Sequence, residues 1–382
     1  MKYLLLTGST GLVGRYLLRD LLKRGHQVAV LVRSDGKHSA IERIDEIMRL
    51  WEKQSECNLP RPVCLQGDVT APGLGLDDES RSWVGRNCDA MMHNAASLNF
   101  LGADRGGEPW RTNLDGTREV LAFCQTTGIR KFHYVSTTYV CGDREGVILE
   151  DDLNAGQGFR NDYEHSKFQA EQLVRAVDYL DPPTVYRPAV IAGDSVTGYT
   201  NTYHGLLHHL KFMATLFRNV PPGPDGIRYV PLRLKMTGDE QRNIVPVDWV
   251  SAVMLRLYET PAAHGGTYHL APTHPMTPRE LIAAVESYFR VDGAEFVGHT
   301  SIADGRSDTE QKTDESLELY EAYTLTDPTF DMTNTNRFAA DIVCPHLDEA
   351  MIHRFIDFGE ANKWGKLPRK KPTAQQNEPR AD

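Results

Sequence analysis

The stretch Tyr3-Leu4-Leu5-Leu6-Thr7-Gly8-Ser9-Thr10-Gly11-Leu12-Val13-Gly14-Arg15 decides the fold of this chain. Its apolar beginning predicts a buried strand, and the apolar residues that follow recur at helical spacing: Leu12, Tyr16, Leu17, Leu21 and Leu22. A glycine turn between a strand and a helix is where the pyrophosphate of a dinucleotide binds in many α/β proteins. The stretch therefore predicts a dinucleotide site at the start of the chain.

The three glycines of this turn are expected to have separate roles. Gly8 allows the tight turn after the strand, Gly11 lets the backbone approach a phosphate, and Gly14 lets the helix pack closely on the sheet. The free N–H groups of the first helical turn then point at the anion, and the helix dipole adds to the attraction. The alternative is an ordinary strand-to-helix turn that needs glycine only for its positive φ.

The composition is that of a globular protein. The chain has 382 residues, of which 40% are hydrophobic and 25% charged, and its formal net charge is −10. That charge argues against nucleic acid and anionic membranes as partners, and no apolar stretch approaches the ~20 residues of a membrane span. The cysteines, at positions 57, 64, 88, 124, 141 and 344, contain no Cys-x-x-Cys pair. We therefore expect reduced thiols, no bound metal and a cytoplasmic protein.

Arginines near the end of the second predicted strand indicate which dinucleotide binds. Residues 27–32 form an apolar run that ends at Arg33, where an acidic side chain would bind the ribose 2′-hydroxyl of NAD. An arginine suits a 2′-phosphate instead, so Arg33 favours NADP, and Arg43 in the next helix is placed to assist it. The alternative for Arg33 is a solvated strand-end arginine. Asp68, after the third strand, is placed either to bind adenine or to cap a turn.

Strands and helices alternate through the first half of the chain. Further strands are predicted over residues 63–69, 89–96, 131–138 and 184–191, and helices over 39–53, 109–127 and 161–178. This alternation implies right-handed crossovers and an α/β fold with a doubly wound parallel sheet of the Rossmann type. His93 lies within one of the apolar strands and is expected to be a hydrogen-bonded core histidine.

The second half of the chain has a different pattern. We predict a dinucleotide-binding domain over residues 1–195, to which sheet elements return near 240–260, and a smaller α/β substrate-binding region over 196–365. Residues 203–218 predict a helix rich in His, Leu and Met that suits an apolar substrate. Residues 299–316 are polar and predict a loop or a poorly ordered segment, and residues 366–382 predict a disordered tail.

The chemistry is predicted to lie on a helix that begins near Asn161. Tyr163 and Lys167 are four residues apart, so both project from one face of this helix. A lysine ammonium close to the phenol favours the phenolate and would lower the pKa of Tyr163 toward the range of an acid–base catalyst. The preceding strand ends in three hydroxyl residues, 136–138, one of which is placed to donate a hydrogen bond to a substrate carbonyl. Without this context, a Tyr-x-x-x-Lys pair is usually a surface pair.

These motifs together resemble the extended short-chain dehydrogenases/reductases, and within them the thioester-reductase and fatty-acyl-CoA-reductase branch. The resemblance runs in order over residues 3–255. The segments that carry it are 7–14, 31–33 with Arg43, 67–76, 93–96, 113–117, 135–140, 156–167, 187–198 and 245–250. The family has the Rossmann-type fold that the alternation predicts.

The resemblance implies a role for each matching position. The catalytic residues would be Thr137 as the hydroxyl donor, Tyr163 as the acid–base and Lys167 as its partner and as a ligand of the nicotinamide ribose. The cofactor would be bound by Gly8, Thr10, Gly11, Leu12, Val13 and Gly14 at the pyrophosphate, Arg33 and Arg43 at the 2′-phosphate, Asp68 and Val69 at adenine, Ala95 and Ala96 along the cleft, and Pro188 to Ile191 at the carboxamide. Asn113 would support the site through its helix.

The implied function is an NAD(P)H-dependent reductase of a carbonyl or thioester in a biosynthetic pathway, with NADP favoured over NAD. A thioester would be presented by coenzyme A or a carrier protein and would give an aldehyde or an alcohol. The oligomeric state stays open, with a homodimer as one option. The segment 101–108 departs from the substrate-side loop that is usual in this branch. Two alternatives stay open. One is an epimerase or dehydratase acting on a nucleotide sugar, and the other is a non-catalytic dinucleotide sensor, which would not need the pair Tyr163 and Lys167.

Overall fold

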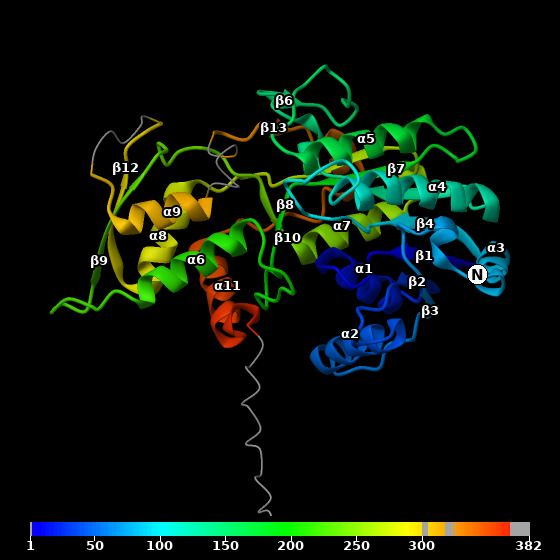
Figure 1. Ribbon diagram of the computed structural model, residues 1–382, viewed down its shortest axis with the longest axis horizontal. Helices are drawn as coiled ribbons and strands as arrows, with labels where there is room; N and C mark the ends of the chain where they lie inside the picture. The colour runs from blue at the N-terminus through cyan, green and yellow to red at the C-terminus, as the bar shows by residue number, and fades with distance from the viewer. Residues whose placement is uncertain (1, 300–304, 318–322, 324, 367–382) are drawn as a thin grey trace, which may run out of the picture.

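A seven-stranded parallel sheet forms the core of the larger part of the molecule (Figure 1). The computed structural model describes residues 2–299, 305–317, 323 and 325–366. The strand order is β11-β7-β5-β4-β1-β2-β3, with β1 (Tyr3–Thr7), β2 (Val28–Val32), β3 (Val63–Gln66), β4 (Cys88–His93), β5 (Lys131–Val135), β7 (Thr184–Pro188) and β11 (Thr267–Leu270). The order reverses between β1 and β4. The carboxyl ends of these two strands therefore flank the crevice where doubly wound sheets bind ligands.

Helices cover both faces of this sheet because its strands are apolar on both sides. β2, for example, has the sequence Val-Ala-Val-Leu-Val and is buried along its whole length. One face is covered by α1 (Leu12–Lys23), α2 (Ala40–Ser55) and α7 (Val247–Glu259), and the other by α3 (Asp78–Asn87), α4 (Gly116–Thr127) and α5 (Asp162–Ala176) (Figure 1). The α/β fold with a doubly wound sheet is thus confirmed.

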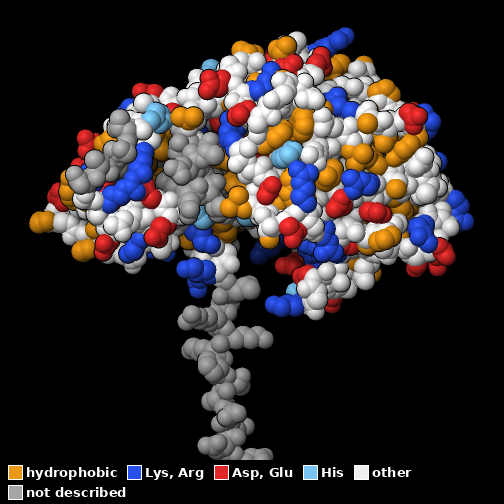
Figure 2. Space-filling view, turned by 45° about the horizontal axis from the view of Figure 1, so that its top comes forward, with side chains coloured by type: hydrophobic (Ala, Val, Ile, Leu, Met, Phe, Trp, Pro, Cys, Tyr) orange, Lys and Arg blue, Asp and Glu red, His pale blue; other side chains and the backbone are white. Residues whose placement is uncertain are grey.

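A smaller region lies beside the sheet, at the opposite end of the molecule from α3 (Figure 1). Its apolar core lies between α6 (Leu206–Arg218), α8 (Pro278–Phe289) and α11 (Glu349–Ala361). Parallel two-stranded pairs join other segments: β8 (Val190–Ala192) with β10 (Ile244–Pro246), β9 (Arg228–Leu234) with β12 (Val291–Phe296), and β6 (Val147–Ile148) with β13 (Thr329–Phe330). Helices α9 (Asp308–Leu317) and α10 (Thr333–Ala339) also belong to the second half. Acidic and basic side chains are interspersed over the face in Figure 2.

Pro188 ends a strand of the sheet, and His93 has the environment predicted for it. Pro188 is the last residue of β7, which pairs with both β5 and β11, so it marks a strand end inside the sheet. His93 is a core histidine: it is 1% exposed, and its Nδ1 lies 2.8 Å from the Thr7 hydroxyl.

The prediction of a loop over residues 299–316 is wrong from Asp308 onward, where α9 begins. Ser307 and Glu310 cap this helix reciprocally: Glu310 N donates to the Ser307 hydroxyl (3.2 Å), and Ser307 N donates to the Glu310 carboxylate (2.9 Å). Glu310 also pairs with Arg233 on β9 at 2.7 Å. Residues 300–304 and the predicted tail from residue 367 lie outside the described residues, and the division at residue 195 stays a prediction.

Candidate active site

The glycine turn folds tightly against the end of β4. Gly8 has a φ of +71°, and a Cβ at this position would lie 2.6 Å from the backbone nitrogen of Ala95. A Cβ at Gly14 would lie 2.0 Å from the carbonyl oxygen of Gly8, so the close approach at Gly14 is to the turn itself rather than to the sheet. At Gly11 the nearest atom would be 3.5 Å away. Gly11 is also the N-cap of α1 and makes no side-chain cap, which leaves the first N–H groups of the helix to an anionic ligand.

A cavity of about 1130 Å³ extends from this turn into the smaller region. The predicted residues that line it are Gly8, Thr10, Gly11, Leu12, Val13, Arg33, Asp68, Val69, Ala95, Ala96, Thr137, Tyr163, Lys167, Pro188 and Ile191. The structure therefore brings residues from the ends of six strands of the sheet, from β8 and from two helices into one crevice. Two predicted residues do not line it: Gly14 is buried in the turn, and Arg43 lines a neighbouring cavity.

That neighbouring cavity, of about 670 Å³, lies where β2 and β3 end. Arg43 donates a hydrogen bond of 2.6 Å to the carbonyl oxygen of Arg33, and the Arg33 side chain is 70% exposed, 3.9 Å from Asp68. Asp35, which the sequence analysis missed, lies 3.9 Å from Arg43. Hydrogen bonds from backbone N–H groups, first that of His38, lower the pKa of Asp35 to about 2. Two guanidinium groups and two carboxylates thus meet at this end of the crevice.

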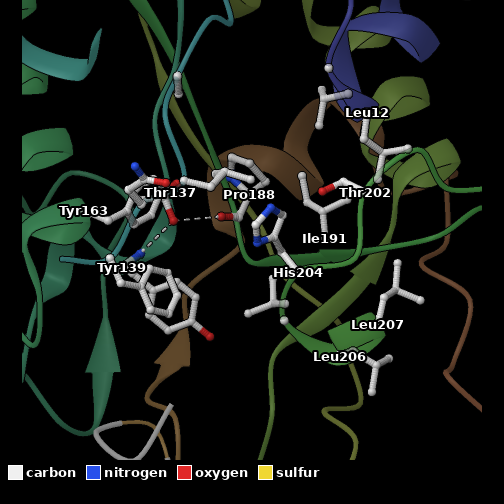
Figure 3. Close-up of a pocket in the computed structure, with 18 of the residues that line it drawn as sticks. Leu12, Thr137, Tyr139, Tyr163, Pro188, Ile191, Thr202, His204, Leu206 and Leu207 are labelled. Atoms are coloured by element: carbon white, nitrogen blue, oxygen red, sulfur yellow. Dashed lines mark hydrogen bonds between the residues drawn. The ribbon is translucent and has the colours of Figure 1, made fainter. Parts of the chain in front are cut away.

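Thr137 and Tyr163 lie side by side on one wall of the large cavity (Figure 3). Thr137 follows β5, and its hydroxyl donates to the carbonyl oxygen of Pro188 at 3.4 Å. Tyr163 lies in the first turn of α5, which begins directly after Asn161 because the side chain of that residue caps the helix by accepting a hydrogen bond of 3.0 Å from Glu164 N. The elements that place these two hydroxyls are therefore a strand end and a capped helix start.

Lys167 lies one helical turn after Tyr163 and is 2% exposed. Its ammonium donates to the carbonyl oxygen of Val135 at 2.7 Å and to the hydroxyl of Tyr134 at 3.0 Å. Asn113, which was expected to support the site, bonds to the Ser166 hydroxyl at 3.0 Å. The side chain of Asn113 thereby joins the segment before α4 to α5 beside Lys167.

Burial controls the protonation of the Tyr163 and Lys167 pair. It raises the pKa of Tyr163 to about 12, against a smaller lowering by the hydrogen bond with Thr137. It lowers the pKa of Lys167 to about 7, against the opposing charge of Glu171. The prediction of a lowered pKa for Tyr163 is therefore wrong in this structure, because desolvation of the phenolate raises that pKa. Tyr163 is a phenol at neutral pH, as a proton donor must be.

The other half of the cavity is lined by residues that sequence reasoning missed. They are mostly apolar and come from α6, α8, β9 and nearby segments: Leu206, Leu207, Phe212, Met213, Leu216, Leu232, Leu234, Ile244, Met276, Leu281 and Ile282. The pattern of residues 203–218 carried a signal for the α6 wall. The remaining wall is assembled from segments far apart in the sequence, each with too few apolar residues to stand out.

A few polar groups interrupt this apolar wall. The hydroxyl of Tyr139 donates to the carboxylate of Asp327 at 3.0 Å, and burial raises the pKa of Asp327. Tyr323 donates to Glu164 at 2.6 Å and so ties the C-terminal half to the first turn of α5. The ring of Phe100, next to the divergent segment 101–108, lies 6.1 Å from the ring of Tyr163. Phe100, Tyr139, Tyr323 and Asp327 line the same cavity as Tyr163.

Comparison with known proteins assigns the fold and site to a family. The sequence model of the NAD-binding family described as "Male sterility protein" matches residues 6–254. The chain belongs to this family. The resemblance to the thioester-reductase-like branch of the extended short-chain dehydrogenases/reductases is thereby confirmed.

The similar solved structures include reductases of assembly-line synthases. The terminal R domain from the myxalamid PKS-NRPS biosynthetic pathway superposes with a TM-score of 0.76 and 26% identity, covering 97% of this chain and 93% of that one. Gre2 of Candida albicans, solved with NADPH, has a TM-score of 0.63 and 17% identity, covering 94% of this chain and 99% of that one. At that identity, Gre2 shows the fold alone.

Curated relatives of this chain are longer than the chain itself. A linear gramicidin synthase chain from Brevibacillus parabrevis is 26% identical over 374 residues, which cover 93% of this chain and 7% of that protein. Aldehyde reductase lnaA from Aspergillus flavus is 26% identical over 397 residues, covering 92% of this chain and 35% of that protein. The chain thus spans about a third or less of either relative.

The described part of the chain holds neither a membrane-spanning helix nor a cluster of metal-ligating side chains. None of its helices combines the length and apolar character needed to cross a membrane. Within the same residues, no three His, Cys, Asp or Glu side chains are grouped to hold a metal ion. The six cysteines are free thiols.

Proposed function

We propose that this protein is an NADPH-dependent reductase that acts on a thioester with an apolar acyl group. The observation that carries the proposal is the continuity of one cavity, which joins the glycine turn, the Thr137 and Tyr163 hydroxyls, and an apolar lobe. The names of the relatives support it, since they include an aldehyde reductase, a peptide synthase and a terminal R domain.

The residues present fit a dinucleotide. The turn at Gly8 and Gly14 is a cradle that a Cβ at either position would fill, and the uncapped start of α1 offers N–H donors to the pyrophosphate. Arg33 and Arg43 would hold the 2′-phosphate, which favours NADPH over NADH, and Ala95, Ala96, Pro188 and Ile191 would line the nicotinamide end. When bound, the reduced nicotinamide supplies a hydride to the carbonyl carbon.

Thr137 and Tyr163 would act on the carbonyl oxygen of the substrate. Both hydroxyls would donate hydrogen bonds to it, which stabilises the negative charge that develops there. Tyr163 would then transfer its proton to this oxygen, and the buried ammonium of Lys167 would stabilise the resulting phenolate. Collapse of the hemithioacetal releases a thiol and an aldehyde. The chain's own contribution is thus orientation and one proton.

The shape of the lobe suggests the substrate class. Its walls are formed by leucine, isoleucine, methionine and phenylalanine side chains of α6, α8 and β9, and such a surface favours an aliphatic or aromatic acyl group. A nucleotide sugar, the substrate of the epimerase alternative, would place a diphosphate and hydroxyls against these side chains. We infer that the thioester arrives on coenzyme A or on a carrier protein, as the thiolation–reductase arrangement of a structural relative suggests.

A substrate panel tests the proposal directly. The full chain would be supplied with NADPH and acyl-CoA thioesters of increasing chain length, the same acyl groups on a phosphopantetheinylated carrier protein, the matching aldehydes, ketones and a nucleotide sugar. We expect NADPH oxidation with acyl thioesters, and mass spectrometry would show an aldehyde or alcohol product. Oxidation with the ketones alone would contradict the proposal.

Substitution of Tyr163 distinguishes the proposed reductase from the alternative of a non-catalytic dinucleotide sensor. Tyr163→Phe keeps the ring that packs near Phe100 but removes the proton donor. We expect this variant to bind NADPH like the unmodified protein and to lose turnover by about 100-fold or more. Equal turnover in Tyr163→Phe and the unmodified protein would contradict the catalytic role of Tyr163.

A further inference from the structure

The buried tyrosine Tyr134 on β5 contacts the ammonium of Lys167 in two ways. Its hydroxyl oxygen accepts a hydrogen bond of 3.0 Å from Lys167 Nζ, and its ring centroid lies 4.4 Å from the same atom. Tyr134 is 0% exposed and does not line the cavity, so it cannot touch a substrate or cofactor. Any effect of Tyr134 on the chemistry must therefore pass through Lys167.

Tyr134 packs against the core of the sheet. Its ring centroid lies 5.9 Å from that of His93 on β4, and His93 Nδ1 lies 2.8 Å from the hydroxyl of Thr7 at the end of β1. Tyr134 is thus held between the strand that precedes it in the sheet and the helix that carries Lys167.

The direction of the contact with Lys167 follows from its chemistry. An ammonium can only donate, so the hydroxyl oxygen of Tyr134 accepts from Lys167 Nζ.

We propose that Tyr134 is a positioning residue: its hydroxyl oxygen accepts a hydrogen bond from the Lys167 ammonium and so orients this ammonium toward the nicotinamide end of the cavity. An ammonium has three N–H donors. Those of Lys167 that point away from the cavity are used by Tyr134 and by the Val135 carbonyl, so the remaining one faces the cavity that Lys167 lines. This inference rests on the proposed function of that cavity as a dinucleotide site.

The groups around Lys167 determine what the loss of the Tyr134 hydroxyl should do. On α5 these are Tyr163 and the carboxylate of Glu171, on β5 Tyr134, and on β4 the neutral His93. Glu171 favours the ammonium, but burial outweighs it. Removing an acceptor from the ammonium should lower the pKa of Lys167 further, so that less of the charged form is present at neutral pH.

Two matched substitutions test the proposal. Tyr134→Phe keeps the ring over Lys167 and removes only the hydroxyl. Tyr186→Phe is the control. Tyr186 lies on the neighbouring strand β7 and is as fully buried as Tyr134, but the hydrogen bond of its hydroxyl, 3.0 Å long, is with the core histidine His133 and not with Lys167. Both variants should show similar changes in Tm, which reports their shared structural cost.

NADPH binding and the pH profile then distinguish the two variants. For Tyr134→Phe we expect a Kd for NADPH, measured by tryptophan fluorescence without substrate, that is higher by about tenfold. We also expect the alkaline limb of kcat/KM to move lower by about one pH unit. Tyr186→Phe should leave both unchanged. Equal Kd values and equal alkaline limbs for Tyr134→Phe and the unmodified protein would overturn the proposal.

A second variant keeps the test decisive if Tyr134→Phe does not fold. Tyr134→Met keeps an apolar side chain of similar length in the core but offers no hydroxyl oxygen to Lys167, and should raise the Kd for NADPH in the same direction. An unchanged Kd for Tyr134→Met would also overturn the proposal. Because the Kd measurement needs no turnover, it decides the role of Tyr134 even if no thioester is reduced and the proposed function fails.

Discussion

The carboxylate of Glu171 and the guanidinium of Arg187 form an ion pair in the interior, with 2.6 Å between Oε1 and Nη2 and 3.1 Å between Oε2 and Nε. Neither side chain is exposed. Arg187 also donates to the carbonyl oxygens of Glu150 and Asp152, so the pair ties α5 to β7 and to the segment before α5. The proposed catalytic helix and the strand that ends at Pro188 are therefore held together by one buried charge pair.

Substitution of Glu171 should destabilise the fold strongly. Glu171→Gln leaves the buried guanidinium of Arg187 without its counter-charge, and we expect a loss of about 3–5 kcal/mol in the free energy of unfolding, measured in urea. Asp181→Asn is a suitable control, because the Arg130–Asp181 pair is 63% and 48% exposed and should contribute less than about 1 kcal/mol. A loss for Glu171→Gln as small as that of the control would contradict this account.

The same pair predicts how stability depends on acid. Burial alone would raise the pKa of Glu171, but the charges of Arg187 and Arg175 outweigh it and lower the pKa from 4.5 to about 2. The folded pKa is thus below the unfolded one, so the stabilisation is complete above pH 4.5 and is lost as the pH falls toward 2. Urea unfolding at several pH values in this window should show a steeper loss for the unmodified protein than for Glu171→Gln. Parallel slopes would exclude Glu171 as the source.

Gly11 and Gly14 should respond differently to alanine. A Cβ at Gly14 meets the carbonyl oxygen of Gly8 at 2.0 Å, whereas one at Gly11 meets no protein atom closer than 3.5 Å. We expect Gly14→Ala to lower Tm, and Gly11→Ala to keep the Tm while it weakens NADPH binding, because the new methyl group occupies the space of the phosphate. Calorimetry and an NADPH titration measure the two effects. If Gly11→Ala binds NADPH with normal affinity, the pyrophosphate does not bind at this turn.

The parts of the site predicted from sequence are those specified by local patterns. The strand, the turn at Gly8 and the helix after it are contiguous, and Tyr163 and Lys167 are fixed relative to each other by one helical turn. Parallel strands bring their carboxyl ends to one edge, so Thr137 and Pro188 could be placed without knowing any side-chain contact. Each of these inferences needs only neighbouring residues and the rule that the sheet is parallel.

The parts that could not be predicted depend on distant segments or on burial. The apolar lobe combines α6 with single residues such as Ile244 and Met276, whose proximity follows only from the folded chain. The pKa of Tyr163 depends on how completely the site is desolvated, which a four-residue spacing does not reveal. The start of α9 was encoded locally by Ser307 and Glu310, but the polar composition around it favoured a loop.

Arg33 should decide the choice between the two dinucleotides. Arg33→Ala removes a guanidinium from the 2′ end of the crevice, and we expect the KM for NADPH to rise about 10- to 100-fold while that for NADH changes little. Arg118→Ala is a control on the exposed side of α4, where Arg118 pairs only locally with Asp115. If Arg33→Ala raises the KM for NADPH and the KM for NADH equally, Arg33 does not bind the 2′-phosphate.

The apolar lobe should control acyl specificity separately from cofactor binding. Met213 lies on the face of α6 that lines the cavity and is 8% exposed, whereas Thr215, two residues later, is exposed and does not line it. Met213→Gln places an amide against the acyl group, and its desolvation should lower kcat/KM for a long acyl thioester by about tenfold or more. The KM for NADPH should not change, and Thr215→Gln should affect neither constant.

The dependence on acyl chain length makes this last prediction specific. A short acyl group, such as acetyl, does not fill the lobe, so Met213→Gln should reduce its kcat/KM much less than that of a long chain. The ratio of the two values cancels any general loss of active protein, which a comparison of single rates would not. If the ratio is the same in Met213→Gln and the unmodified protein, the acyl group does not lie along α6, and the apolar lobe must serve another part of the substrate.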